Sequence, residues 1–216
     1  GPIMIGPSSS HTAGAVRVGL VANQLVGDIS RVSSVDCYFH GSFATTYKGH
    51  RTDIAIIAGI LGFMADDTRI PDALDIAKRQ GICTNFIPCD LGNYHENTAK
   101  VVVTLKDKST VTVVGSSIGG GNIKIVEIDG FSCNFAANTN SLIIRHNDER
   151  GVIAHVSTVL AQSDVNIATM TVLRTKKGDD ASMVIECDSP ITDDIIEQIK
   201  RIKSITNALY IAPAIY

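Results

Sequence analysis

The chain has 216 residues, 44% of them hydrophobic and 19% charged, and a formal net charge of −3 at pH 7. A chain of this length buries a substantial core, as one large domain or two small ones. The acidic balance, the 5% aromatic content and the lack of tryptophan exclude a basic, base-stacking surface for nucleic acid. The longest apolar stretch, residues 54–65, is too short to span a bilayer. We therefore expect neither a nucleic-acid nor a membrane partner.

The first motif is a run of polar side chains ahead of an apolar segment. Five consecutive positions carry hydroxyls or an imidazole, and residues 13–26 follow as an apolar run without proline. This pattern predicts a helix with Ser10 or Thr12 as its N-cap. The free N–H groups and partial positive charge of a helix start also favour a carboxylate or a phosphate. An anion site and an ordinary cap both stay open for this run: Ser8, Ser9, Ser10, His11 and Thr12.

Strands and helices alternate in the segments that follow. Residues 32–40 are predicted to form a strand, with Val35, Cys37 and Phe39 on one face. Residues 41–51 are rich in glycine, threonine and charged side chains, which predicts a loop that carries His50. We expect Asp53 to cap a buried helix over 54–64, a second helix over 71–79 and a strand over 82–88.

A glycine-rich segment, 115–121, lies between two of the next three strands, which are expected at 99–105, 110–114 and 122–128. Its glycines allow backbone N–H groups to approach a ligand or to form an anion-binding nest. A plain hairpin loop explains the same glycines equally well. Gly119, Gly120 and Asn122 are the candidate binding residues of this segment.

The pattern changes after residues 131–140, whose composition is that of a linker. Strands are expected at 142–145, 165–173, 181–187 and 205–211, with helices after Gly151 and Thr192. This order is that of a ferredoxin-like βαββαβ unit of about 75 residues. The fold class is therefore α/β (α+β), with a mixed N-terminal domain over 1–136, a linker over 137–141 and a ferredoxin-like domain over 142–216.

The five cysteines are odd in number and form no C-x-x-C pair. Neither a disulfide framework nor a metal site within this chain is expected, and free thiols suit the cytoplasm. Cys83 and Cys89 are the nearest pair, and we expect both to be buried structural residues.

Several long blocks of the sequence carry a family resemblance. Gly6–Gly19 is similar to the signature of the β chain of two-subunit, iron–sulfur-dependent bacterial L-serine dehydratase. Arg51 and Glu96 stand where that pattern has glycine and proline. The resemblance continues through four further blocks: His40–Ala44, Tyr47–His50, Asn93–Thr98 and Gly115–Ile123.

The resemblance implies an L-serine ammonia-lyase (EC 4.3.1.17) that converts L-serine to pyruvate and ammonia. The family requires an α chain, which carries the [4Fe–4S] cluster, and uses no pyridoxal phosphate. By resemblance, the loop from Ser8 to Thr12 faces the active site, with Ser9, Ser10 and Thr12 as carboxylate donors. His11 is then the best candidate for a catalytic or orienting group, and His50 is the second.

The C-terminal part resembles an ACT domain, through Asn147–Val152 and Val165–Ile167. ACT domains are small-molecule regulatory modules that usually pair side by side, which implies a homodimer. Their effector would bind near Asn147, Asp148, Gly151 and Asn166. Because the N-terminal domain also resembles the allosteric substrate-binding domain of some phosphoglycerate dehydrogenases, a purely regulatory subunit that senses an amino acid or anion is the alternative.

Overall fold

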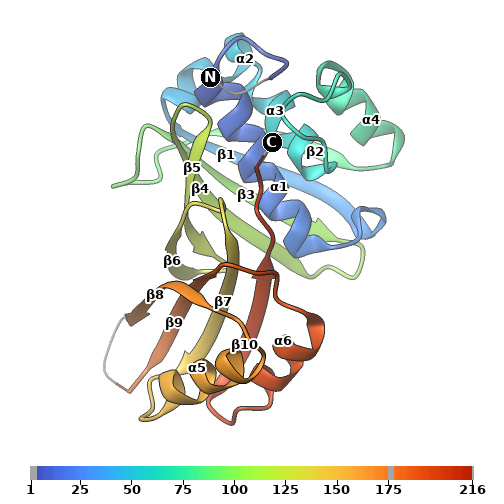
Figure 1. Ribbon diagram of the computed structural model, residues 1–216. Helices are drawn as coiled ribbons and strands as arrows, with labels where there is room; N and C mark the ends of the chain where they lie inside the picture. Colours follow the sequence, from blue (N-terminus) through green and yellow to red (C-terminus); the bar gives the residue numbers. More distant parts are fainter. Residues whose placement is uncertain (1–3, 175–177, 216) are drawn as a thin grey trace. The chain divides into compact units, whose positions relative to one another are not determined.

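The computed structural model describes residues 4–174 and 178–215 and shows two compact units (Figure 1). The first unit runs to Gly130 and includes Ala214 from the C-terminal end, and the second comprises Phe131–Pro213. Each is mixed in secondary structure, as the predicted α+β class requires. The domain bounds of 1–136, 137–141 and 142–216 stay a prediction.

The first unit is built on a sheet with the strand order β2-β1-β3-β4-β5. Strands β1 and β2 are parallel, and the other neighbours are antiparallel. Val35, Cys37 and Phe39 are fully buried on one face of β1, as predicted. The strands are β1 (Val32–Gly41), β2 (Cys83–Pro88), β3 (Asn97–Leu105), β4 (Thr110–Gly119) and β5 (Asn122–Ile128).

Two helices of this unit, α1 and α3, cross in close contact. Helix α1 packs on α3 and on strands β3, β4 and β5. Gly19 of α1 and Gly59 of α3 lie at the crossing, where an added Cβ on Gly59 would overlap the carbonyl oxygen of Val16. The crossing therefore depends on these two missing side chains. The helical segments are η1 (Ser9–Gly14), α1 (Ala15–Val26), η2 (Ile29–Arg31), α2 (Ser42–His50), α3 (Thr52–Ile60), η3 (Ile70–Asp72) and α4 (Ala73–Arg79).

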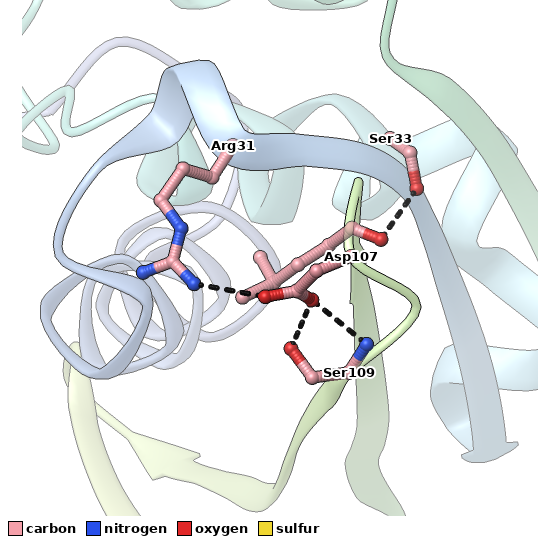
Figure 2. Close-up of polar contacts among 5 residues, drawn as sticks. Arg31, Ser33, Asp107 and Ser109 are labelled. Carbon is pink, nitrogen blue, oxygen red and sulfur yellow. Dashed lines mark hydrogen bonds and ion pairs between the residues drawn. The ribbon is translucent and has the colours of Figure 1, made fainter.

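The turn between β3 and β4 is closed by Asp107 (Figure 2). Its carboxylate accepts hydrogen bonds from the backbone N–H and the hydroxyl of Ser109. It also forms an ion pair with Arg31 at 3.2 Å. Local bonds of this kind fix a tight turn, and they join the start of β1 to the end of β3.

The second unit is a four-stranded antiparallel sheet in the order β10-β7-β9-β8, with two helices. Leu142, Ile144, Leu160, Met183 and Ile199 are fully buried in its apolar core. The predicted ferredoxin-like βαββαβ order is confirmed. Its elements are β7 (Asn140–Asn147), α5 (Val152–Gln162), β8 (Ile167–Arg174), β9 (Asp180–Cys187), α6 (Asp193–Lys200) and β10 (Ile205–Ile211), preceded by β6 (Phe131–Phe135).

The loop predicted over residues 41–51 is wrong, because Ser42–His50 form helix α2. Gly41, with φ of 58°, lets the chain turn sharply at the end of β1. Phe43 is then fully buried, with its ring 6.2 Å from that of Phe39. This tertiary anchor outweighs the weak helix propensity of the Thr45–Thr46 pair.

The glycine-rich loop predicted over residues 115–121 is also wrong for its first part. Strand β4 continues to Gly119, and Gly115 pairs with Ile125 of β5. A Cβ on Gly115 would lie 2.9 Å from Cγ2 of Val18. Gly115 therefore serves the close packing of α1 on the sheet.

The composition of residues 131–140 is that of a linker, but the first five of them form strand β6. Cys133 and Phe135 are buried, at alternate positions of this short strand. Among the residues that the structure describes, no helix has the length and apolar character needed to cross a membrane.

Candidate functional site

The helical structure at the polar run, residues 8–12, begins earlier in the chain than predicted. Ser8 is the N-cap, and its hydroxyl oxygen accepts from the backbone N–H of His11 at 3.3 Å. The prediction of Ser10 or Thr12 as N-cap is wrong, because the π-helical segment η1 (Ser9–Gly14) precedes α1. Ser9 and Ser10 are half-buried at its start.

His11 lies at the centre of a group of side chains from η1 and α2. Its ring centroid is 4.4 Å from that of His50 and 5.1 Å from that of Phe43. Nε2 is 3.1 Å from Oγ1 of Thr46, and Nδ1 is 3.4 Å from Oγ of Ser8. The structure thus brings together three of the predicted site residues, Ser8, His11 and His50.

The pKa of His11 is lowered, first by burial and then by the neighbouring His50. The ring is therefore neutral at neutral pH, and a neutral imidazole can accept a proton.

Thr46 and Phe43 were not among the predicted site residues, because their segment was expected to be a loop. The available signal was spacing: Thr46 and His50 are four residues apart, which places them on the same face of a helix.

Buried polar atoms without a hydrogen-bond partner gather in the elements around η1. Within residues 4–174 and 178–215, no hydrogen-bond partner is found for the buried hydroxyls of Thr12, Thr52 and Ser117 or for the buried Nδ1 of His50. Ser117 lies directly against Gly14 of η1. A buried polar atom without a partner costs about 1–3 kcal/mol, so several in one region mark a place where a ligand or water completes the bonding.

Thr12 lines a small cavity of about 140 Å³ beside Arg51, Ile54 and Pro71. Arg51 is the N-cap of α3 and has left-handed backbone geometry, with φ of 59°. The predicted cap, Asp53, is instead in the first turn, where its carboxylate accepts from the N–H of Ile54 at 2.9 Å. Burial raises the pKa of Asp53, against the opposing effect of that hydrogen bond.

The β4–β5 hairpin carries the other predicted binding residues. Gly119 ends β4, Gly120 is in the turn and Asn122 begins β5. The buried Arg17 of α1 donates to the carbonyl oxygen of Gly121 at 2.8 Å, which holds the hairpin on the helix. The body of the hairpin packs against η1, but the described hydrogen bonds of the His11 ring go to Ser8 and Thr46.

The prediction that Cys83 and Cys89 are buried is wrong, because Cys83 is exposed and Cys89 is half-buried. Strand β2 is the edge strand beside β1, so its side chains are only partly covered. Cys37 and Cys187 are buried, and burial raises the pKa of the Cys187 thiol to about 11. Among the described residues, no group of three or more His, Cys, Asp or Glu side chains is placed to hold a metal ion.

The second unit has a cleft of about 640 Å³ at the start of α5. Asp148 and Gly151 line it, together with Arg174. The carboxylate of Asp148 accepts from the N–H of Gly178 at 3.0 Å and from Arg174 at 2.8 Å, and these bonds lower its pKa. The described lining includes neither Asn147 nor Asn166; the Asn166 side chain bonds to Asp188.

Two family models match the chain. The serine dehydratase beta chain model matches residues 2–127, and the ACT domain model matches residues 140–204. The L-serine dehydratase beta chain of Peptoniphilus asaccharolyticus is 40% identical over 212 residues, 98% of this chain and 95% of that protein. The probable L-serine dehydratase beta chain of Bacillus subtilis (strain 168) is 43% identical over 212 residues, again 98% and 95%.

A third relative has a different name. D-3-phosphoglycerate dehydrogenase of Bacillus subtilis (strain 168) is 30% identical over 194 residues, which are 89% of this chain but 36% of that protein. The two beta chains match in length as well as in sequence, and the first family model covers more than half of the chain. The chain therefore belongs to the serine dehydratase beta chain family, and it carries an ACT domain.

Proposed function

We propose that this chain is the β subunit of a cytoplasmic L-serine dehydratase, L-serine ammonia-lyase (EC 4.3.1.17). It would convert L-serine to pyruvate and ammonia together with an α chain. The observation that carries the proposal is the pairing of His11 and His50 beside buried, unpartnered hydroxyls. The five free thiols suit a reducing compartment.

The reaction requires a base for the α-proton, a grip on the carboxylate and an electrophile on the β-hydroxyl. In this proposal the first two come from the present chain. His11 and His50 handle the α-proton, since their rings are adjacent and His11 is neutral at neutral pH. The electron pair of the broken C–H bond expels the hydroxide, and the resulting enamine is hydrolysed to pyruvate and ammonia.

The carboxylate grip is assigned to hydroxyls and backbone N–H groups of η1 and the hairpin. Thr12 supports this assignment, because its buried hydroxyl has no hydrogen-bond partner among the residues that the structure describes. Hydroxyl donors bind a carboxylate with charge-assisted hydrogen bonds. The proposed set is Ser8, Ser9, Ser10, Thr12, Gly119, Gly120 and Asn122.

The cysteines of this chain do not fit a resident [4Fe–4S] cluster, which usually needs four thiolates together. Cys37 is in the first unit, Cys133 and Cys187 are in the second, and burial disfavours the thiolates of Cys37 and Cys187. We therefore assign the cluster to the α chain. Pyridoxal phosphate is not expected, since no lysine stands in a recognisable motif for it.

The ACT domain is proposed to bind a regulatory amino acid or small anion. Asp148 and Gly151 support this, because they line the cleft beside the guanidinium of Arg174. Asn147 and Asn166 belong to the proposal by resemblance only. A homodimer through this domain is supported by β8, an edge strand with Val172 exposed, since an edge strand offers unpaired backbone groups to a second copy.

A purely regulatory subunit is the second candidate. It is favoured by the 30% identity to D-3-phosphoglycerate dehydrogenase, which extends over both units. In that case the N-terminal unit would sense an anion without taking part in chemistry.

Reconstitution tests the proposal. The purified chain, loaded anaerobically with iron and sulfide, should neither hold a stable cluster nor release pyruvate from L-serine. Mixed with an α chain of the family, it should restore pyruvate formation. A cluster absorbance and pyruvate release from this chain alone would contradict the two-chain assignment, and an α chain that is fully active without it would favour the regulatory alternative.

A further inference from the structure

Thr46 is the residue of α2 whose hydroxyl contacts the imidazole of His11. Its Oγ1 lies 3.1 Å from Nε2 of His11, although the two residues are 35 positions apart in the sequence. The same Oγ1 is 2.6 Å from the carbonyl oxygen of Ser42, one helical turn earlier. These two contacts together determine where the hydroxyl proton lies.

A threonine hydroxyl has one proton to donate, and a carbonyl oxygen can only accept. The 2.6 Å contact with Ser42 therefore uses the Thr46 proton. Towards His11, the Thr46 oxygen is then an acceptor, so Nε2 of His11 must be the donor.

On the other side of the His11 ring, Nδ1 faces a hydroxyl group that can donate to it. The Ser8 hydroxyl oxygen accepts from the backbone N–H of His11 at 3.3 Å, and its own proton is free to point at Nδ1, 3.4 Å away. A neutral imidazole protonated at Nε2 has its lone pair at Nδ1. Both contacts of the ring are thus satisfied by one tautomer.

We infer that Thr46 is a positioning residue that fixes His11 as the neutral Nε2–H tautomer, with its basic lone pair at Nδ1. The catalytic consequence of this assignment depends on the proposed function, whereas the tautomer itself does not. A proton that His11 takes from the substrate then arrives at Nδ1: the C–H bond breaks, an N–H bond forms and the electron pair stays on the substrate. Ser8 is the partner that the substrate displaces, because its contact is the longer of the two.

Loss of the fixed tautomer should lower kcat. In the serine proteases a wrong imidazole tautomer lowers kcat by about 10⁴-fold. Thr46 is a single neutral partner, so we expect a smaller effect, about tenfold or more in kcat.

The chain offers a matched control at the neighbouring position. Thr45 also donates its hydroxyl to the carbonyl oxygen of Ser42, at 3.2 Å, but it is exposed and its described hydrogen bond does not involve His11. Thr46→Val and Thr45→Val each remove a hydroxyl bond to the Ser42 carbonyl oxygen, and the first also removes the histidine contact. Thr46→Ser keeps the hydroxyl and should restore the parent behaviour.

The decisive measurement is long-range ¹H–¹⁵N NMR of the His11 ring in the full chain near pH 8, where the lowered pKa of His11 leaves this ring neutral. We expect His11 as Nε2–H in the parent, in Thr45→Val and in Thr46→Ser, and a shift towards Nδ1–H in Thr46→Val. An Nδ1–H ring in the parent, or an unchanged ring in a folded Thr46→Val chain, would overturn the assignment. If Thr46→Val fails to fold, an Nδ1–H ring in the parent or in Thr46→Ser would still overturn the assignment.

Turnover with the α chain is the second readout. Thr46→Val should lower kcat more than it changes KM, with Thr45→Val and Thr46→Ser close to the parent. A tautomer shift with kcat within twofold of Thr45→Val would overturn the positioning role. If the parent mixture makes no pyruvate, the proposed function fails, and the tautomer comparison still tests Thr46.

Discussion

The two units of this chain bury polar groups in opposite ways. Of the six described side-chain polar atoms that are buried without a hydrogen-bond partner, five lie in the first unit and one, Nε2 of His146, in the second. The core of the second unit is almost wholly aliphatic, with residues such as Leu142, Val156 and Ile199 fully buried. The first unit therefore carries five of these six unpartnered buried atoms, and the second unit carries one.

This difference indicates that the first unit carries the candidate site, whereas the core of the second unit is built for stability. Fully satisfied or apolar burial stabilises a fold, whereas unpaired buried polarity persists where function requires it. Four of the five unpartnered atoms of the first unit belong to η1 or to elements that pack on it, as with Thr12 and Ser117, and the fifth, Oδ1 of Asn97, lies in β3. Four predictions test this contrast, from the largest expected effect to the smallest.

The largest effect is expected at His11. His11→Ala should lower kcat in the enzyme reconstituted with the α chain by about 10²–10⁴-fold, because loss of one acid–base group has this cost. Its effect on the free energy of unfolding should be small, since the ring is only half-buried. Pyruvate release at saturating L-serine measures the first quantity, and denaturant unfolding measures the second.

His155→Ala is the control for this variant, because His155 is an exposed histidine of the second unit. Its kcat should equal that of the parent. If His11→Ala stays within twofold of the parent, the catalytic assignment of His11 is wrong.

The helix crossing of the first unit should be the most sensitive purely structural point. Gly59→Ala places a Cβ against the carbonyl oxygen of Val16, and overpacking of this kind costs about 1–3 kcal/mol. Gly49→Ala is the matched control, since nothing lies within 4 Å of its added Cβ. In helix α2 it should be neutral or stabilise by up to about 1 kcal/mol. Equal unfolding midpoints for the two variants would argue against the close crossing.

Two adjacent serines of β4 test the unpartnered hydroxyls directly. Ser116 shares a hydrogen bond of 2.7 Å with Thr98, whereas the hydroxyl of the fully buried Ser117 has no partner in the described part of the chain. Ser116→Ala should destabilise the chain by about 1 kcal/mol, while Ser117→Ala should be neutral or stabilising. Chemical denaturation of the chain without substrate measures both, and the opposite order would refute the contrast between the two hydroxyls.

The smallest effect concerns pH. Because the pKa of His11 in the folded chain is lowered below its usual value of about 6.5, the unfolded chain binds the proton more readily. Stability is therefore full above about pH 6.5 and falls as the pH drops through the lowered pKa. His11→Gln should reduce this acid-side loss, measured as the difference in unfolding free energy between pH 8 and pH 5. His155→Gln should leave this loss of unfolding free energy unchanged. An equal loss in the two variants would contradict the lowered pKa of His11.

Local sequence patterns were sufficient for most of the secondary structure. The 3.6-residue spacing of Val152, Val156 and Leu160 predicted α5, and the alternation of Val35, Cys37 and Phe39 predicted β1. Such periodicities arise from the geometry of one element against one core, so they are visible within a few turns of chain. The βαββαβ order of the second unit follows from them, because it is a sum of local patterns.

Tertiary structure decided the site. The contact between His11 and His50 joins residues far apart in the sequence, and it exists because Ser42–His50 form a helix anchored by the buried Phe43. Apart from the four-residue spacing of Thr46 and His50, the local pattern did not indicate this helix, since its stability comes from packing against Phe39 and not from propensity. The glycines of β4 predict a loop for the same reason: Gly115 is required by Val18 of α1, a neighbour that only the fold provides. The sequence alone thus determined most of the elements and the polar run, while the contacts around His11 depended on long-range packing.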